Sequence, residues 1–279
     1  MSGALHLSLS LVSGQAYGSN KLVPVEHMTE NMKFYIINLA RSVDRRRHMT
    51  DLMEKHGLDY SFVDAVDSRD IDFPNAQYDE NKYRRCHGKI TNPAMCGNYF
   101  SHMKALKEFL SSGEEWGVIC EDDITFSDNM VNLVEKATMS FPELNLLRLS
   151  GRRNGLPLKT ASLDETYSLV VDRGRQTGTG CYAIRGDAAE KIAEKLKVMY
   201  LPFDHSFDRE WMWKGVTLRI SPIPVSQFAF NDSTVSVKTR EKLPFMKRYL
   251  TVFPYRAKTE VMRVIYRYSV YRKLMRSRR

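Results

Sequence analysis

The 279-residue chain is 43% hydrophobic and 27% charged, a composition typical of a globular protein with a sizeable core. No stretch approaches the roughly 18 consecutive apolar residues that a membrane-spanning helix requires, so a transmembrane protein is not expected. The net charge of +9 is local, because residues 242–279 hold twelve Lys or Arg against one acid, Glu260. The preceding body is almost neutral and contains no nucleic-acid motif, so no nucleic-acid partner is expected.

Residues 1–31 precede the first strong strand pattern. They have no basic leader and no clear apolar block, so a cleaved signal peptide is not expected. We treat them as an extension, disordered or left over from cloning, and begin the folded domain at residue 32. The cysteines lack the paired spacing of a zinc site and fit a reducing cytosol; they are Cys86, Cys96, Cys120 and Cys181.

Short apolar runs and periodic polar segments alternate along the chain. They predict strands at 33–39, 60–66, 116–120, 145–149, 168–171 and 180–184, and helices at 44–56, 93–110, 128–140 and 187–197. Residues 68–92 are polar and contain Pro74, Asn75 and Gly88, which predicts a long loop; in a compact domain such loops are more often functional than idle. The alternation indicates an α/β domain of three layers around a mostly parallel sheet.

The sharpest chemical feature is the acidic triplet Glu121-Asp122-Asp123. It follows the apolar run 117–120, so it lies at the carboxyl end of a predicted buried strand, the edge where open α/β sheets bind ligands. Adjacent carboxylates repel one another, and a hard divalent cation such as Mn²⁺ or Mg²⁺ would neutralise them. An exposed acidic turn would explain the triplet alone equally well, and the apolar strand ahead of it favours the metal.

Four motifs in this order resemble glycosyltransferase family 25. Phe34 to Arg46 reads Phe-Tyr-Ile-Ile-Asn-Leu-Ala-Arg-Ser-Val-Asp-Arg-Arg, similar to the family's opening strand and arginine-rich turn. Gly97, Ser101 and His102 stand where the family has Gly-Cys-x-x-Ser-His. The Glu-Asp-Asp triplet is the third motif, and the Pro-Phe-Asp segment ending at Asp204 is a weaker fourth.

The chain departs from the family pattern at two positions. Asn98 replaces the cysteine, which we interpret as a packing residue, and Met95 stands where an acidic residue is common. The second change leaves the contacts of residues 93–102 open.

The resemblance implies a GT-A-like fold over residues 32–240, a UDP-sugar donor and inversion at the anomeric carbon. In that light Asp122 and Asp123 would hold the metal, Mn²⁺ or Mg²⁺, that bridges the diphosphate. Arg41 and Arg45 would lie near the diphosphate at the first strand-to-helix turn, although a solvated helix face is the alternative for the arginines that follow. The predicted donor-binding residues are Asn38, Leu39, Arg41, Arg45, Ser101, His102, Glu121 and Asp122.

Inverting transfer also needs a base that accepts the proton of the acceptor hydroxyl. Asp204 is the first candidate because it alone matches the family pattern, and Asp208 is the second. Pairing of Asp208 with Arg209 or Lys214 in an ordinary surface helix is the alternative.

Residues 241–279 form a basic tail predicted as helical pieces broken at Pro254. One stripe at helical spacing is apolar (Val261, Val264, Ile265, Tyr268, Tyr271 and Met275), and Arg263, Arg267, Lys273 and Arg276 lie mostly off it. This pattern suits an anionic membrane surface near a lipid-linked acceptor. A helix that simply packs on the domain is the alternative.

The sequence therefore predicts an inverting, metal-dependent glycosyltransferase. It would move a hexose, with galactose from UDP-galactose as first choice, onto an oligosaccharide of a bacterial surface glycan such as lipooligosaccharide. We expect a cytoplasmic protein, peripheral on the inner face of the cytoplasmic membrane. A non-catalytic nucleotide- or glycan-binding protein of the same fold and membrane association is the alternative.

Overall fold

An eight-stranded sheet carries the fold in a computed structural model that describes residues 32–152, 155–227 and 242–278. The strand order is β2-β1-β3-β8-β5-β9-β7-β6. The strands are β1 (Lys33–Asn38), β2 (Tyr60–Asp64), β3 (Trp116–Glu121), β5 (Leu144–Arg148), β6 (Pro157–Ser162), β7 (Ser168–Asp172), β8 (Cys181–Arg185) and β9 (Val216–Ser221). Two short strands, β4 (Thr125–Phe126) and β10 (Val225–Ser226), form a separate antiparallel pair.

Six of the eight strands run in one direction, because only β7 and β8 are antiparallel to both of their neighbours. The pairs β1–β2, β1–β3 and β5–β9 are parallel. The register of β1 with β3 sets Ile37 beside Glu121. The carboxyl ends of these two central strands therefore lie at the same edge of the sheet.

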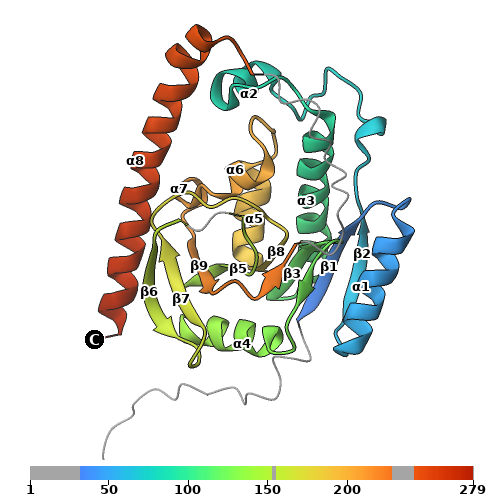
Figure 1. The fold of residues 1–279 in the computed structure, drawn as a ribbon, viewed down its shortest axis with the longest axis vertical. Coiled ribbons are helices and arrows are strands. Elements are labelled where there is room, and N and C mark those ends of the chain that lie inside the picture. Colours follow the sequence, from blue (N-terminus) through green and yellow to red (C-terminus); the bar gives the residue numbers. More distant parts are fainter. Residues whose placement is uncertain (1–31, 153–154, 228–241, 279) are drawn as a thin grey trace, which may run out of the picture.

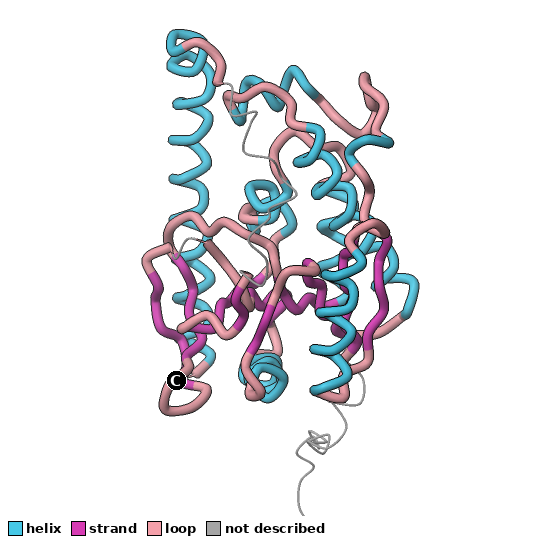
Figure 2. The backbone as a smooth tube through the Cα atoms, turned by 45° about the vertical axis from the view of Figure 1, so that its right-hand side comes forward, coloured by secondary structure: helices cyan, strands magenta, loops and turns pink. Residues whose placement is uncertain are grey.

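Helices cover both faces of the sheet and complete the three predicted layers (Figures 1 and 2). On one face α1 (Val43–Lys55) and α4 (Met130–Ser140) bury Met49, Met53 and Leu133. On the other, α3 (Pro93–Ser112) and α5 (Gly186–Lys195) bury Phe109 and Ile192. The shorter helices are α2 (Glu80–His87), α6 (Phe203–Phe207) and α7 (Glu210–Trp213). Burial of these apolar side chains, at about 25 cal/mol per Å² of apolar surface, holds the layers together.

The predicted strands and the four predicted helices are confirmed within a few residues of their ends. The interpretation of 68–92 as one loop is wrong, because it contains α2 and a short 3₁₀ helix, Ser68–Asp70. Helix α2 is mostly polar, which hides its period. Its ends are marked nevertheless: the Asp79 side chain accepts a hydrogen bond from the Lys82 backbone N–H, and Gly88 closes the helix at φ 77°.

The C-terminal segment is a single helix, α8 (Phe245–Ser277), which runs beside α2 at one end and beside β6 at the other (Figure 1). The predicted break at Pro254 is wrong. A helix tolerates an internal proline when the carbonyl four residues earlier finds another partner, and here Leu250 and Pro254 lie on the exposed side, where water reaches that carbonyl. In the described part of the chain, no helix has the length and apolar character needed to cross a membrane.

The orientation of α8 also differs from the prediction. Arg263 and Arg267, expected among the outward cations, are buried together with Val270 and Leu274. Val261, Val264, Ile265 and Tyr268 of the predicted apolar stripe are exposed. The arginines turn inward because buried carboxylates lie opposite them. Residues 1–31, expected to be an extension, and residues 228–240 lie outside the described residues.

Candidate active site

Three predicted residues meet at the carboxyl ends of β1 and β3. The Asn38 amide donates a hydrogen bond of 2.7 Å to Oδ2 of Asp122, and Arg45, in the first turns of α1, donates one of 2.9 Å to Oδ1. Asn38 is fully buried and Asp122 is 8% exposed. The parallel register of β1 and β3 therefore assembles an asparagine, an arginine and an aspartate that lie up to 84 residues apart in the sequence.

Asp123 is the least satisfied acid of the triplet. Its Oδ2 lies 3.8 Å from Arg45, and its Oδ1 is buried with no hydrogen-bond partner in the described structure. Burial, followed by the charge of Glu121, raises the pKa of Asp123 to about 6 against the opposing effect of Arg45. A buried carboxylate oxygen without a donor is costly. A cation would satisfy it.

The donor set fits a metal that the nucleotide completes. Among the described residues no three His, Cys, Asp or Glu side chains are grouped so as to hold a metal by themselves. Mg²⁺ usually takes only one or two protein carboxylates and fills its remaining positions with water and phosphate oxygens. Asp122 and Asp123 supply such carboxylates, with Arg45 beside them.

Glu121 faces inward. Its Oε1 lies 3.3 Å from Nε2 of His102 and accepts a 3.4 Å hydrogen bond from Asn98, and its Oε2 accepts one of 3.2 Å from Gln227. Burial acts to raise the pKa of Glu121, but the His102 and Asn98 contacts outweigh it and the pKa is lowered. Glu121 is therefore an ionised acid whose two carboxylate oxygens both have hydrogen-bond partners.

Ser101 and His102, which the sequence predicts to contact the donor, are both buried. Ser101 is buried, accepts from the Val66 backbone N–H and donates to the Gly97 carbonyl. His102 has no exposed surface and stacks on Phe203, with 4.3 Å between ring centroids. Both side chains lie inside the helix–sheet interface, so they position the site through their neighbours and cannot reach a donor.

Leu39 and Arg41 lie in the turn between β1 and α1. Leu39 is half-buried, and Arg41 is exposed and forms an ion pair with Asp67. Asp67 also accepts hydrogen bonds from the backbone and guanidinium of Arg69. The turn therefore lies at the carboxyl edge of the sheet, as predicted. The Arg41 side chain points to Asp67, just after the end of β2.

Sequence reasoning missed a pocket of about 430 Å³ close to the acidic triplet. It lies between the β4–β10 pair and the segment after β5, and Arg152 and Gln227 belong to its lining. The charge of Arg152 acts on both Glu121 and Asp123. Arg152 follows a predicted strand by three residues, and the rule that ligands meet the carboxyl ends of strands could have found it.

The segment between β7 and β8 links the two halves of the site. The Gly178 N–H donates to Oδ2 of Asp204 at 3.4 Å, and the Gly180 carbonyl accepts the Glu121 backbone N–H at 2.8 Å. Gly178 has φ 89° and lies so close to the Arg152 backbone that a Cβ would be 3.2 Å from its N atom. Asp204 and the acidic triplet therefore contact one short loop, and about a quarter of the Asp204 side chain is exposed.

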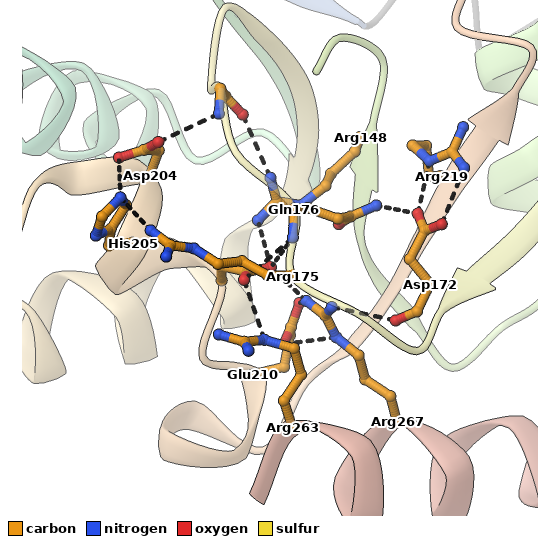
Figure 3. Close-up of polar contacts among 12 residues, drawn as sticks. Arg148, Asp172, Arg175, Gln176, Asp204, His205, Glu210, Arg219, Arg263 and Arg267 are labelled. Carbon is orange, nitrogen blue, oxygen red and sulfur yellow. Dashed lines mark hydrogen bonds and ion pairs between the residues drawn. The ribbon is translucent and has the colours of Figure 1, made fainter. Parts of the chain in front are cut away.

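Asp208 cannot act as the base that the sequence offered as second choice. It has no exposed surface and forms ion pairs with Arg267 at 2.5 Å, Arg263 at 3.1 Å and Arg148 at 3.6 Å. Figure 3 shows Arg263 and Arg267 extending from α8 towards Arg148. The backbone N–H of Gln176 contacts it at 3.3 Å. No acceptor hydroxyl can approach a carboxylate enclosed in this way, so Asp208 is a structural counter-ion. The alternative, a surface pairing with Arg209 or Lys214, is also absent from its ion pairs with the described residues.

The family model described as glycosyltransferase family 25 (LPS biosynthesis protein) matches residues 31–207. The chain belongs to glycosyltransferase family 25. The match covers β1, the acidic triplet and Asp204. The three-layer domain is therefore the GT-A-like domain of a family 25 glycosyltransferase.

Two curated proteins are similar to this family 25 chain. The lacto-N-neotetraose biosynthesis glycosyltransferase LgtB of Neisseria meningitidis serogroup B is 25% identical over 101 residues, 35% of this chain and 34% of LgtB. A protein of Haemophilus influenzae named as a glycosyltransferase is 24% identical over 166 residues, 58% of this chain and 57% of its own length. The chain thus spans between a third and just over half of the length of these relatives.

Solved structures resemble the chain distantly. A Drosophila β-1,4-galactosyltransferase 7 mutant in complex with manganese, UDP-Gal and xylobiose aligns with 79% of each chain at 11% identity and a TM-score of 0.40. A glycosyltransferase involved in glycosylation of the major capsid of PBCV-1 aligns with 59% of this chain and 64% of its own at 12% identity and a TM-score of 0.30.

Proposed function

We propose that this family 25 chain is an inverting, metal-dependent hexosyltransferase that takes galactose from UDP-galactose. The acceptor would be a saccharide of a bacterial surface glycan such as lipooligosaccharide. The main support is the Asp122–Asp123 pair at the end of β3, where one buried carboxylate oxygen of Asp123, beside Arg45, has no hydrogen-bond partner among the described residues. The family description, an LPS biosynthesis protein, and the role in the name of LgtB support the acceptor class.

The residues of the site suit this chemistry. Asp122 and Asp123 would hold a Mn²⁺ or Mg²⁺ ion, which supplies positive charge to the diphosphate leaving group. Arg45 and Arg152 stand next to these acids and would bind the phosphate oxygens. Asp204 is partly exposed and contacts the 173–180 segment. It would accept the proton of the acceptor hydroxyl while the hydroxyl oxygen bonds to the anomeric carbon and the bond between that carbon and UDP breaks.

The proposal is tested by measuring UDP release and product formation with purified chain, a truncated oligosaccharide acceptor and a panel of UDP-hexoses. We expect UDP-galactose with Mn²⁺ to give the highest turnover and EDTA to abolish it. Turnover with a different UDP-hexose and none with UDP-galactose would show that the proposed donor is wrong. Saturable UDP binding without hydrolysis or transfer of any donor would favour the non-catalytic alternative.

Helix α8 supports a second part of the proposal, attachment to an anionic membrane surface on the cytoplasmic side. Besides the predicted stripe, its exposed side chains include Phe245, Met246, Tyr249 and Leu250. Exposed cations flank them, among them Lys247, Lys258, Arg272, Lys273 and Arg276. Apolar side chains at the interface and cations at the phosphates are what a peripheral helix requires.

We expect the chain to cosediment with vesicles that contain anionic phospholipid and to remain in solution with purely zwitterionic vesicles. Replacing Leu250 and Ile265, 68% and 66% exposed, by serine should weaken vesicle binding at least about tenfold, because each loses most of its interfacial burial. Leu156 is similarly exposed, at 64%, but lies outside α8, so Leu156→Ser should bind as the wild type does. Equal binding of both variants would contradict the assignment of α8.

A further inference from the structure

A second, smaller cavity lies between α2, α6 and α8. It measures about 20 Å³, and basic side chains dominate its lining: His87, Arg175, His205, Arg209, Arg256 and Arg263. The cavity holds about one water-sized group, so a single oxygen of a larger group fits inside it and a sugar ring does not. Its rim includes Glu260, whose side chain is 47% exposed, so a group attached to a larger molecule can enter from solvent.

The positive charge of this cavity is not balanced by the described residues. Arg263 is paired with Asp208 and Glu260. The contacts of Arg175, Arg209 and Arg256 are instead with His205, the Tyr200 hydroxyl and the His87 carbonyl, and within the described ranges none of the three has a carboxylate within ion-pair distance. Arg209 is buried, and Arg175 and Arg256 are half-buried. A cation that is removed from water without a counter-ion is unfavourable.

The pKa values reflect the same deficit. Burial lowers the pKa of the Arg175 and Arg256 guanidinium groups from the ordinary arginine value. At Arg267, by contrast, Asp208 and Glu210 overcome burial and raise the pKa. An anion in the cavity would give Arg175 and Arg256 a negative counter-charge, such as Asp208 and Glu210 give Arg267.

His87 supplies an independent sign of a missing ligand. It is 3% exposed, lines the cavity, and neither ring nitrogen has a hydrogen-bond partner in the described structure. Its ring centroid is 5.0 Å from that of His205, and burial, aided by the charge of its neighbours, lowers its pKa to about 2. A neutral His87 can donate one N–H, and that donor is free for an anion.

We propose that this cavity binds a phosphate group carried by the acceptor saccharide. The three guanidinium groups have no carboxylate partner among the described residues. They match a phosphate monoester, which carries nearly two negative charges and can place one oxygen in the cavity and others at its mouth, better than they match a single carboxylate. The cavity borders Asp204, because His205 lies 3.9 Å from that carboxylate and contacts Arg175 (Figure 3). The acceptor assignment rests on the proposed function, whereas the phosphate site itself does not.

The site is tested without donor or turnover, by ³¹P NMR titration and thermal shift of the full chain with inorganic phosphate, glucose 6-phosphate and glucose. We expect both phosphates to bind, glucose 6-phosphate more tightly, and glucose not to bind. Arg256→Gln should weaken phosphate binding at least about tenfold, because a charge-assisted hydrogen bond is lost. Arg272→Gln, the same charge change at an exposed position of α8, should retain the wild-type affinity.

A pair of substitutions at His87 separates binding from folding. His87→Gln keeps an N–H donor and should retain affinity within about threefold, whereas His87→Leu removes the donor and should lose about tenfold. No phosphate binding in the wild type, or equal loss in Arg256→Gln and Arg272→Gln, overturns the site. Inorganic phosphate binding as tightly as glucose 6-phosphate overturns the saccharide source. Phosphate binding by a chain that turns over no UDP-sugar would overturn the proposed function and leave the site standing.

Discussion

Replacing Arg267 by methionine is expected to lower the free energy of unfolding by about 3–5 kcal/mol. The guanidinium is buried and contacts Asp208 at 2.5 Å, Glu210 at 2.6 Å and the carbonyls of Asp172 and Gly174. Methionine leaves those carboxylates buried without their main counter-ion, and an uncompensated buried charge costs more than the lost attraction. Urea denaturation followed by circular dichroism measures the change.

The matched control is Arg272→Met, which makes the same replacement at an exposed position of α8. We expect it to change stability by less than about 0.5 kcal/mol. Combining Arg267→Met with Glu210→Leu removes both a charge and its partner, so the double variant should lose less than the sum of the single losses. A loss of below about 1 kcal/mol for Arg267→Met would show that α8 is not anchored by this network.

The second large effect is expected for Asp123→Asn, which should lower kcat at least about 100-fold while leaving the melting temperature within about 3 °C of the wild type or above it. Asn is nearly isosteric but is a weak metal ligand. It also removes a negative charge that sits against Glu121 and Asp122. Steady-state kinetics over a range of Mn²⁺ concentrations and a thermal scan measure the two quantities.

The control for this variant is Asp128→Asn, the same exchange at a carboxylate whose side chain is 85% exposed. It should leave both kcat and stability unchanged, because an exposed ion pair contributes little. Full activity of Asp123→Asn, or a loss of activity that merely follows a loss of folded protein, would contradict the assignment of Asp123 to the metal.

Much of the architecture is readable from local patterns. The apolar run after Lys33 and the run before Glu121 are buried from end to end, so they appear as strands without further information. The prediction missed the short helices α6 and α7 and the strand β9, although most of β9 is buried. It also missed two elements that have few buried residues. Helix α2 is mostly polar, and β6, at the sheet edge, buries only the adjacent residues Thr160 and Ala161. An element that borders solvent does not need a continuous apolar signature.

The site divides in the same way. The acidic triplet and its strand could be predicted, because three adjacent carboxylates after an apolar run are unusual without a positive partner. Only the register of β1 with β3 and the start of α1 show that Arg45 contacts Asp122 and that, among the described residues, Oδ1 of Asp123 has no hydrogen-bond partner. The pocket residues Arg152 and Gln227 converge from separate loops. The place of Arg152 just after a predicted strand indicates the sheet edge, but the spacing of the two residues along the chain does not indicate that they share a pocket.

The sequence by itself determined that the chain is an α/β protein of family 25 with acids at the end of a central strand and a basic C-terminal segment. Periodicity and local motifs depend on residues that are neighbours in the sequence, so they can be recognised before the fold is known. Only the tertiary structure showed that four charged or polar residues are buried and what they contact; they are Asp208, His102, Arg263 and Arg267. Whether a charged or polar side chain contacts solvent, substrate or a buried counter-charge depends on residues that folding brings together from distant positions. Arg267 and Asp208, for example, are 59 residues apart in the sequence and form a buried ion pair.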